Sequence, residues 1–240
     1  MPVLTDNAVS HIAFSEEDFL VKTLETKEEM TQAYQLRHRV FAEQLRWVPE
    51  TEDRQEMDMY DLWGVTVGVF DGKGVLLGMA RLLPSFGEFM LGNEFGALLP
   101  SDYVVRKEHD TAEITRLTVN PDIRDPKLSS RVMLAVLKGI YQWAVENRIR
   151  YYYLEVEHRF LRALRILGFP CEPIGPVVKL PPAGAAAVAA LYDMARFDEE
   201  NAKRRPDFLE WISTTKLLNG EVVSGRTSSY DADAAPLAMV

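Results

Sequence analysis

Cysteine is nearly absent from this chain of 240 residues, which contains Cys171 alone. A lone cysteine excludes an intramolecular disulfide and a metal site built from cysteines, and it is typical of a reducing compartment. Long apolar runs are also absent, since no stretch approaches the ~20 apolar residues that span a bilayer. The start of the chain carries acidic side chains and no long apolar run, so we expect no signal peptide. These absences predict a cytoplasmic protein that is not inserted in a membrane.

Positive charge is in the minority, because 27 Lys and Arg residues face 36 Asp and Glu residues, giving a net charge of −9. This balance argues against binding to nucleic acid or anionic membranes through bulk charge, although it leaves local basic patches open. Hydrophobic residues make up 47% of the chain and charged residues 26%, which is ordinary for a soluble globular protein. The length fits one sizeable domain. We find no internal repeat.

The clearest element is a helix that begins after Thr26. Thr26 and Glu29 have the spacing of a capping box, in which each side chain satisfies a backbone donor near the other. One face of this helix carries four residues at i, i+4, i+7 and i+11: Met30, Tyr34, Arg37 and Phe41. Arg37 is an anomaly there, because an unpaired charge on the face that should meet the core is costly. We therefore expect an anionic partner for Arg37.

The remaining pattern alternates short strands and helices, after a polar segment at 48–61 that predicts a loop. Strands are expected at 65–69 and 75–79 (a hairpin), 112–119, 151–157 and 174–180, and helices at 92–99, 127–147, 160–167 and 183–197. This order predicts an α/β fold, a single-domain three-layer α/β/α sandwich with a mixed central sheet. We divide the chain into an N-terminal extension (1–25), the main domain (26–200), a C-terminal extension (201–224) and a flexible tail (225–240).

A set of spaced residues carries the most specific signal. An Arg-x-x-x-Phe pair is followed six residues later by Trp, and eleven residues after that by Asp-x-x-Asp; Gly-x-x-Arg and Glu-x-x-Arg come next. The residues of this set are Arg37, Phe41, Trp47, Asp58, Asp61, Arg81, Phe95, Glu113 and Arg116. The set resembles the pattern of the N-acyl-homoserine-lactone synthase (autoinducer synthase) family, and the order of elements resembles the GCN5-related N-acetyltransferase fold.

This resemblance implies a pocket for S-adenosylmethionine, which brings a sulfonium, an ammonium, a carboxylate and an adenine. Aromatic faces suit the sulfonium and the adenine, acids suit the cationic end, and guanidinium groups bind a carboxylate through two parallel hydrogen bonds. The candidates for this pocket are Arg37, Phe41, Trp47, Asp58, Asp61 and Arg81. Whether each arginine contacts the ligand or pairs with the acids stays open at this point.

The resemblance also implies two bond-forming steps of a quorum-sensing signal synthase. In the first step the amine of S-adenosylmethionine attacks an acyl thioester, and Glu113 is the candidate base, with Arg116 as the second catalytic residue. In the second step the substrate's own carboxylate closes the lactone and releases methylthioadenosine, which needs a near-attack geometry but no added base. On a flat strand Glu113 and Arg116 point to opposite faces, so one shared site requires a β-bulge or a strand splay.

The acyl donor is expected to be a thioester of acyl carrier protein or coenzyme A. Residues 119–127, which follow the central strand, contain no glycine, so basic side chains rather than backbone are the candidates for phosphates or an acidic carrier. These docking candidates are Arg124, Lys127, Arg131, Arg150 and Arg162. An apolar tunnel between the last strands should hold the acyl chain, lined by Met90, Leu91, Phe95, Tyr152, Leu154, Val156 and Leu164.

Each of these residues also has a plainer interpretation. Single aromatics are usually core residues, loop acids are usually solvated, and Glu113 with Arg116 taken alone favours a structural ion pair. A metal site is not expected without clustered histidines or cysteines, and no cofactor is implied because S-adenosylmethionine is a substrate. Two other functions stay open, namely an N-acyltransferase for a different amine and a non-catalytic module that binds S-adenosylmethionine or acyl thioesters. The joint occurrence of the whole set favours the synthase.

Overall fold

The computed structural model describes residues 9–226, and its centre is one 11-stranded sheet. The strands are β1 (Ala13–Glu16), β2 (Phe19–Thr23), β3 (Val65–Phe70), β4 (Leu76–Pro84), β5 (Thr111–Val119), β6 (Tyr151–Glu157), β7 (Cys171–Pro173), β8 (Val178–Leu180), β9 (Ala185–Asp193), β10 (Thr214–Leu217) and β11 (Val222–Ser224). Their order is β11-β10-β1-β2-β3-β4-β5-β6-β9-β7, with β8 also paired to β9. Strands β5 and β6 pair in parallel, and the other pairings between described strands are antiparallel, so the sheet is mixed.

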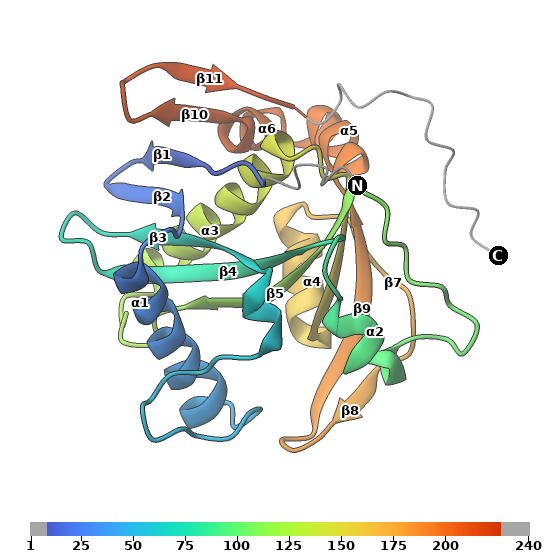
Figure 1. Cartoon of the computed structure of the whole chain (residues 1–240). Helices are drawn as coiled ribbons and strands as arrows, with labels where there is room; N and C mark the ends of the chain where they lie inside the picture. Colours follow the sequence, from blue (N-terminus) through green and yellow to red (C-terminus); the bar gives the residue numbers. More distant parts are fainter. Residues whose placement is uncertain (1–8, 227–240) are drawn as a thin grey trace, which may run out of the picture.

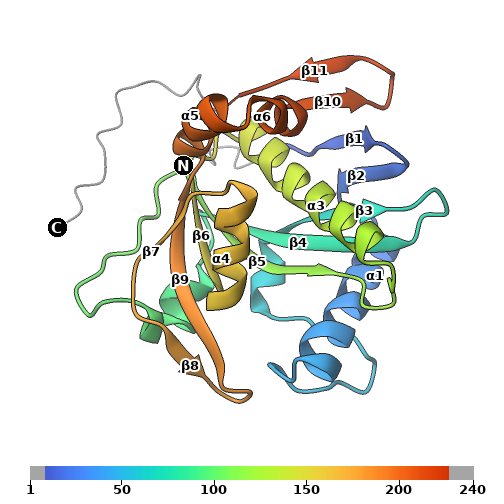
Figure 2. The ribbon, with the colours of Figure 1, turned by 180° about the vertical axis from the view of Figure 1, so that it is seen from behind.

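Helices cover both faces of this sheet. The first face, toward the viewer in Figure 1, carries α1 (Lys27–Arg37), the π-helix η1 (His38–Gln44), the 3₁₀ turns η2 (Met59–Leu62) and η3 (Gly96–Leu98), and α2 (Met90–Asn93). The opposite face, shown in Figure 2, carries α3 (Pro126–Glu146) and α4 (His158–Leu167), with α5 (Met194–Arg204) and α6 (Pro206–Ser213) near one end of α3. The predicted three-layer α/β/α architecture is confirmed. No helix within residues 9–226 is long and apolar enough to cross a membrane.

The first helix begins as the sequence predicts. The Glu29 backbone N–H donates to Thr26 Oγ1 (3.2 Å), and the Thr26 N–H donates to Glu29 Oε2 (3.1 Å), so the capping box is confirmed. The helix then widens into η1, where the Leu45 N–H bonds to the Val40 carbonyl (2.9 Å), five residues back. The sequence did not predict this π-helix. It buries Val40 and Phe41 and brings the chain to the start of the polar loop.

Strand β5 contains a β-bulge, which is an irregularity of the kind that Glu113 and Arg116 need in order to share one site. Met79 pairs with Thr118 and Arg81 pairs with Thr115, so β5 has one residue more than β4 between these two pairs. The extra residue falls at Arg116, whose φ of 53° lies in the left-handed region and marks a β-bulge. Beyond residues 114 and 154, β5 and β6 no longer pair. The expected bulge and the expected splay are therefore both present.

The alanine-rich segment 183–197 was predicted as a helix, and this prediction is wrong. Its first part is β9, and only from Met194 onward is the chain helical, as α5. Strand β9 pairs with β6 over seven positions, including Leu154 with Ala190 and Glu155 with Ala189. Both faces of β9 are buried, and its small side chains lie beside a strand that begins with three tyrosines. Burial between the two helical layers thus outweighs the helix propensity of alanine.

Other elements differ in extent. The segment predicted as a helix at 92–99 forms two short turns, α2 and η3, and the strand predicted at 174–180 is reduced to β8, preceded by β7. Strands β1 and β2 from the N-terminal extension, and β10 and β11 from the C-terminal extension, join the main sheet. The domain boundaries stay a prediction. The proposed tail from 225 falls, apart from Gly225 and Arg226, outside the described residues.

Candidate active site

Arg37 has the anionic partners that its place on the helix requires. Its side chain is fully buried, its Nε donates to Glu56 Oε2 (2.5 Å), and its Nη1 donates to Asp61 Oδ1 (2.6 Å). The guanidinium also lies over the Tyr34 ring, 5.4 Å from its centroid. The sequence predicted an acid for Arg37 but not Glu56, which lies inside the polar loop without a spacing that distinguishes it.

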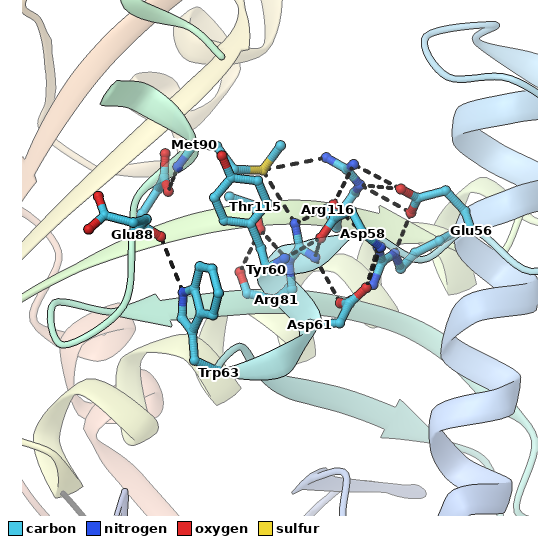
Figure 3. Close-up of polar contacts among 12 residues, drawn as sticks. Glu56, Asp58, Tyr60, Asp61, Trp63, Arg81, Glu88, Met90, Thr115 and Arg116 are labelled. Atoms are coloured by element: carbon cyan, nitrogen blue, oxygen red, sulfur yellow. Dashed lines mark hydrogen bonds and ion pairs between the residues drawn. The ribbon is translucent and has the colours of Figure 1, made fainter. Parts of the chain in front are cut away.

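Arg81 connects the 3₁₀ turn to the centre of the sheet. From the middle of β4, its Nη1 and Nη2 donate to the two oxygens of Asp58 (2.5 and 2.9 Å), and Nη1 also donates to Asp61 (2.7 Å). Its Nε donates to Thr115 Oγ1 on β5 (3.0 Å). Asp58 and Asp61 are themselves held by the capping box of η2. Figure 3 shows these side chains pointing toward one another.

Arg116 completes the network from the bulge in β5. Its Nη2 donates to Glu56 Oε1 (2.8 Å) and Asp58 Oδ2 (3.0 Å), and its guanidinium lies 5.4 Å from the centroid of the Phe41 ring. We call the six side chains Arg37, Arg81, Arg116, Glu56, Asp58 and Asp61 the ion network. The network balances three positive and three negative charges, as a buried cluster must if it is not to destabilise the fold.

Two carboxylates of the ion network, Glu56 and Asp61, stay ionised. Burial raises the pKa of Glu56, but the hydrogen bonds and charges of Arg116 and Arg37 outweigh burial and hold that pKa at about 2. Burial likewise opposes ionisation of Asp61, and Arg37 and Arg81 still keep its pKa below the usual value. These acids are therefore poor proton acceptors near neutral pH.

The depressed pKa of Glu56 predicts how stability depends on pH. Its pKa of about 2 in the folded chain, against 4.5 in a free side chain, corresponds to about 3 kcal/mol of stability. This contribution is present above pH 4.5 and is lost as the pH falls toward 2, where Glu56 protonates in the folded chain too. Urea unfolding should therefore show Glu56→Gln to be less stable than the wild type at pH 7, by a difference that shrinks below pH 4.5. The exposed Glu210→Gln variant should show no such difference; an equal loss in both variants would contradict this prediction.

The pKa of Glu113 is shifted upward, in the opposite direction from those of Glu56 and Asp61, although Glu113 lies on the same face of the sheet as the ion network. Its side chain is buried, and its two oxygens accept hydrogen bonds from the backbone N–H groups of Met90 and Leu91, both at 2.7 Å. Burial raises its pKa to about 7, against the lowering effects of a hydrogen bond with Glu155, of the two N–H donors and of Arg81. A carboxyl group with this pKa can exchange a proton at neutral pH, which is typical of a general base.

A cavity of about 390 Å³ opens where β5 and β6 part. Near the ion network it is bordered by Arg116, Phe41 and Trp47, and it continues between the strands toward α3 and α4. Five residues predicted for the acyl tunnel line it: Met90, Phe95, Leu154, Val156 and Leu164. Two others do not. Leu91 packs in a separate core cluster, and Tyr152 is buried against α3, near the Ile140 carbonyl.

The predicted S-adenosylmethionine residues do not all reach this cavity. Phe41 and Trp47 border it with ring centroids 5.9 Å apart, whereas the Arg37 and Arg81 side chains are fully buried in the ion network. Arg116 is therefore the one of the three network arginines that borders the cavity.

The five docking candidates fall into two groups. Arg131 is paired with Glu17 and Asp18, and Arg150 contacts Asp193 (3.4 Å). Arg124, Lys127 and Arg162 are exposed, and within residues 9–226 their side chains form no ion pair. The same described range contains no group of three His, Cys, Asp or Glu side chains arranged to hold a metal ion.

Comparisons with known proteins relate the chain to one family. A family model described as autoinducer synthase matches residues 21–204. A probable acyl-homoserine-lactone synthase of Sinorhizobium fredii is 27% identical over 158 residues, which cover 64% of this chain and 76% of that protein. An acyl-homoserine-lactone synthase of Aliivibrio fischeri is 30% identical over 142 residues, covering 58% and 73%. The solved structure of BjaI, described as a CoA-dependent acyl-homoserine lactone synthase with MTA, has the same fold, with a TM-score of 0.65 at 21% identity over 81% of this chain and 89% of that one.

Proposed function

The chain belongs to the autoinducer synthase family, and from this premise we propose how its own residues carry out acyl-homoserine-lactone synthesis. Such a synthase is an acyltransferase: it moves an acyl group from a thioester to the amine of S-adenosylmethionine, and lactone formation then releases methylthioadenosine. The observation that carries the proposal is the cavity between β5 and β6. It has the ion network at one end, an apolar lining at the other, and Glu113 buried beside it.

S-adenosylmethionine binds at the end of the cavity that adjoins the ion network. Arg116 lines this end and offers its guanidinium to the substrate carboxylate, while the faces of Phe41 and Trp47 receive the cationic sulfonium or the adenine. Arg37 and Arg81 hold Asp58, Asp61 and Glu56 in place without touching the ligand. This assignment rests on burial, since both guanidinium groups are fully enclosed by their acidic partners.

Glu113 accepts a proton from the substrate ammonium, directly or through another group, so that the free amine can attack the thioester carbon. Its pKa of about 7 leaves a large fraction ionised at neutral pH, and the same burial makes proton uptake favourable. Lactone formation then needs only the substrate carboxylate, already ionised, held in line with the carbon next to sulfur. The salt-bridged Arg116 is suited to hold that carboxylate in this position.

The acyl chain extends from the reacting carbon into the apolar part of the cavity, toward Leu154, Val156 and Leu164. The thioester arm is carried by coenzyme A or by an acyl carrier protein, and both are anionic. Of the five docking candidates, Arg124, Lys127 and Arg162 form no ion pair within residues 9–226 and can meet either one. We place the reaction in the cytoplasm, in keeping with the lone cysteine, whose thiol is buried.

Reversing the charges at Arg124 and Lys127 tests this docking surface. The double variant Arg124→Glu/Lys127→Glu should raise KM for the acyl thioester by about tenfold at low salt, and less at high salt, because the contact is electrostatic. KM for S-adenosylmethionine should stay unchanged. The double variant Lys203→Glu/Arg204→Glu on α5 carries the same charge change and should leave both constants as in the wild type. Equal effects in the two double variants would show that net charge, not this surface, is responsible.

The product of a bacterial host expressing the chain tests the function itself. We expect the culture extract to contain a lactone that is absent from the empty-vector control and that alkaline treatment converts to the ring-opened acid. Mass spectrometry of the intact lactone then identifies the acyl group. An acylated product that alkali leaves unchanged would instead indicate an N-acyltransferase for another amine, and no new product with a soluble, folded protein would argue for a binding module.

A further inference from the structure

Glu155 is a second carboxyl group beside Glu113, on the neighbouring strand. Glu113 on β5 pairs with Tyr153 on β6, and Glu155 follows two residues later, on the same face of β6. Sequence patterns alone do not single out Glu155, because its importance depends on which strand lies next to β5. The side chain of Glu155 lines the cavity in which the two substrates are proposed to meet.

Neighbouring strands place these two carboxyl groups together: burial raises both pKa values, and a hydrogen bond between the carboxyls lowers that of Glu113 and raises that of Glu155. Two ionised carboxylates have only acceptors, so this bond requires that one of them carries a proton. Glu113 accepts two backbone N–H bonds, which favour its ionised form. Glu155 has one backbone donor, its own N–H, against the two of Glu113, and its buried Oε1 has no hydrogen-bond partner within residues 9–226. Glu155 is therefore the partner that holds the proton, and burial raises its pKa well above the usual value.

Other ionisable groups lie near this pair. Arg81 on β4 lowers the pKa of Glu113, Arg116 lines the same cavity as Glu155, and burial, with a smaller effect of the Glu113 charge, raises the pKa of the Tyr60 hydroxyl on η2. Within the described residues, Glu113 is the charged side chain that acts most strongly on the Glu155 carboxyl. The pair thus carries one shared proton and one negative charge. A buried carboxyl that is short of donors and lines a substrate cavity is a site where a ligand donor is expected.

We propose that Glu113 and Glu155 together form the proton acceptor of the reaction, with Glu155 in direct contact with the substrate ammonium. This inference rests on the proposed function and adds a catalytic residue to it. Glu155 passes its own proton to Glu113 through the existing hydrogen bond and takes the ammonium proton on the oxygen that faces the cavity. Glu113 thereby changes from a carboxylate to a neutral carboxylic acid without moving away from the Met90 and Leu91 N–H groups.

Each bond that breaks in this step is matched by a bond that forms. An N–H bond of the ammonium breaks, an O–H bond forms on Glu155, and the pair changes from one proton and one negative charge to two protons and no charge. The freed nitrogen lone pair forms the C–N bond, the C–S bond breaks, and the leaving thiolate takes the second proton from nitrogen. The products are the amide and a neutral thiol. The pair returns one proton to water when the cavity reopens.

Glu155→Gln is the variant that tests this relay. Glutamine keeps the size of the side chain and can still donate to Glu113, but it cannot accept and pass on a proton. With purified full-length protein, S-adenosylmethionine and an acyl thioester, we expect kcat for methylthioadenosine release to fall by about 100-fold or more. The rise of activity with pH near 7 should remain, because Glu113 still has its donor. Glu146→Gln, at the exposed end of α3, is the matched control and should match the wild type.

A second variant distinguishes the loss of a proton acceptor from the loss of side-chain packing. Glu155→Ala should be similarly slow, and added formate, which is a small carboxylate, should restore turnover, whereas formamide should not. Glu155→Gln turning over within twofold of the wild type would overturn the relay and leave Glu155 as a hydrogen-bond donor to Glu113 only. Equal rescue by formate and formamide would also overturn it. The wild type assayed in parallel tests the proposed function separately from the role of Glu155. If the wild type releases no methylthioadenosine, the result counts against the proposed function rather than against Glu155.

Discussion

The Glu113→Gln variant is expected to release methylthioadenosine about 100 to 10,000 times more slowly than the wild type at neutral pH. Glutamine preserves the shape of the side chain but removes the group whose pKa of about 7 allows it to accept the ammonium proton. Because an interaction needed for the chemical step is lost, kcat should fall while KM for S-adenosylmethionine changes little. Steady-state kinetics with both substrates, together with a thermal melt to show that the variant is folded, measure this effect.

The pH dependence of the wild type provides an internal check on the same residue. The base is active when it is ionised, so kcat/KM should rise with pH up to about 7 and then level off, losing about tenfold per unit below that value. Glu108→Gln, a substitution in the exposed turn before β5, is the matched control and should keep the wild-type rate and profile. A Glu113→Gln variant that retains more than a tenth of the wild-type kcat would show that Glu113 is not the base.

Arg81→Met should produce the largest loss of stability, about 3–5 kcal/mol in the free energy of unfolding. Methionine fills much of the same volume, but it leaves Asp58 and Asp61 with one guanidinium fewer in a place where Arg81 is fully buried. The network then carries one unbalanced negative charge, and Thr115 loses its donor. Urea unfolding at pH 7 measures this loss.

A surface ion pair supplies the comparison for Arg81. Lys203 on α5 pairs with Glu199 (2.9 Å), and both side chains are about 70% exposed, so Lys203→Met should cost well under 1 kcal/mol. If Arg81→Met were as stable as Lys203→Met, the ion network would not support the fold in the way its burial suggests. The activity of Arg81→Met should fall as well, because Asp58 is also a partner of Arg116.

The sequence predicted those parts of the site that depend on local spacing. A charge between two aromatic positions on one helix face was enough to require an acid for Arg37, and the structure supplies three: Glu56, Asp61 and, at 3.7 Å, Asp58. The alternation along β5 was enough to require a bulge or a strand splay before Glu113 and Arg116 could share a site, and a bulge lies at Arg116 itself. In both cases the geometry of one element and the cost of burying a charge are sufficient for the prediction.

The parts that could not be predicted depend on contacts between distant segments. Glu56 is one of several acids in a polar loop, and only the folded loop shows that it lies between Arg37 and Arg116. Glu155 becomes significant because β6 lies beside β5, which the sequence alone does not reveal. Strand β9 was mistaken for a helix because alanine favours helices locally, whereas its burial on both faces is a property of the whole sheet.

Release of methylthioadenosine by the purified chain is the most direct test of the proposed synthesis. We expect release only when S-adenosylmethionine and an acyl thioester are present together, because the amide must form before the substrate carboxylate closes the ring. We also expect one lactone formed for each methylthioadenosine released, and loss of both products in Glu113→Gln. Release from S-adenosylmethionine alone, or none with acyl thioesters of any chain length on either carrier, would contradict the proposed synthesis.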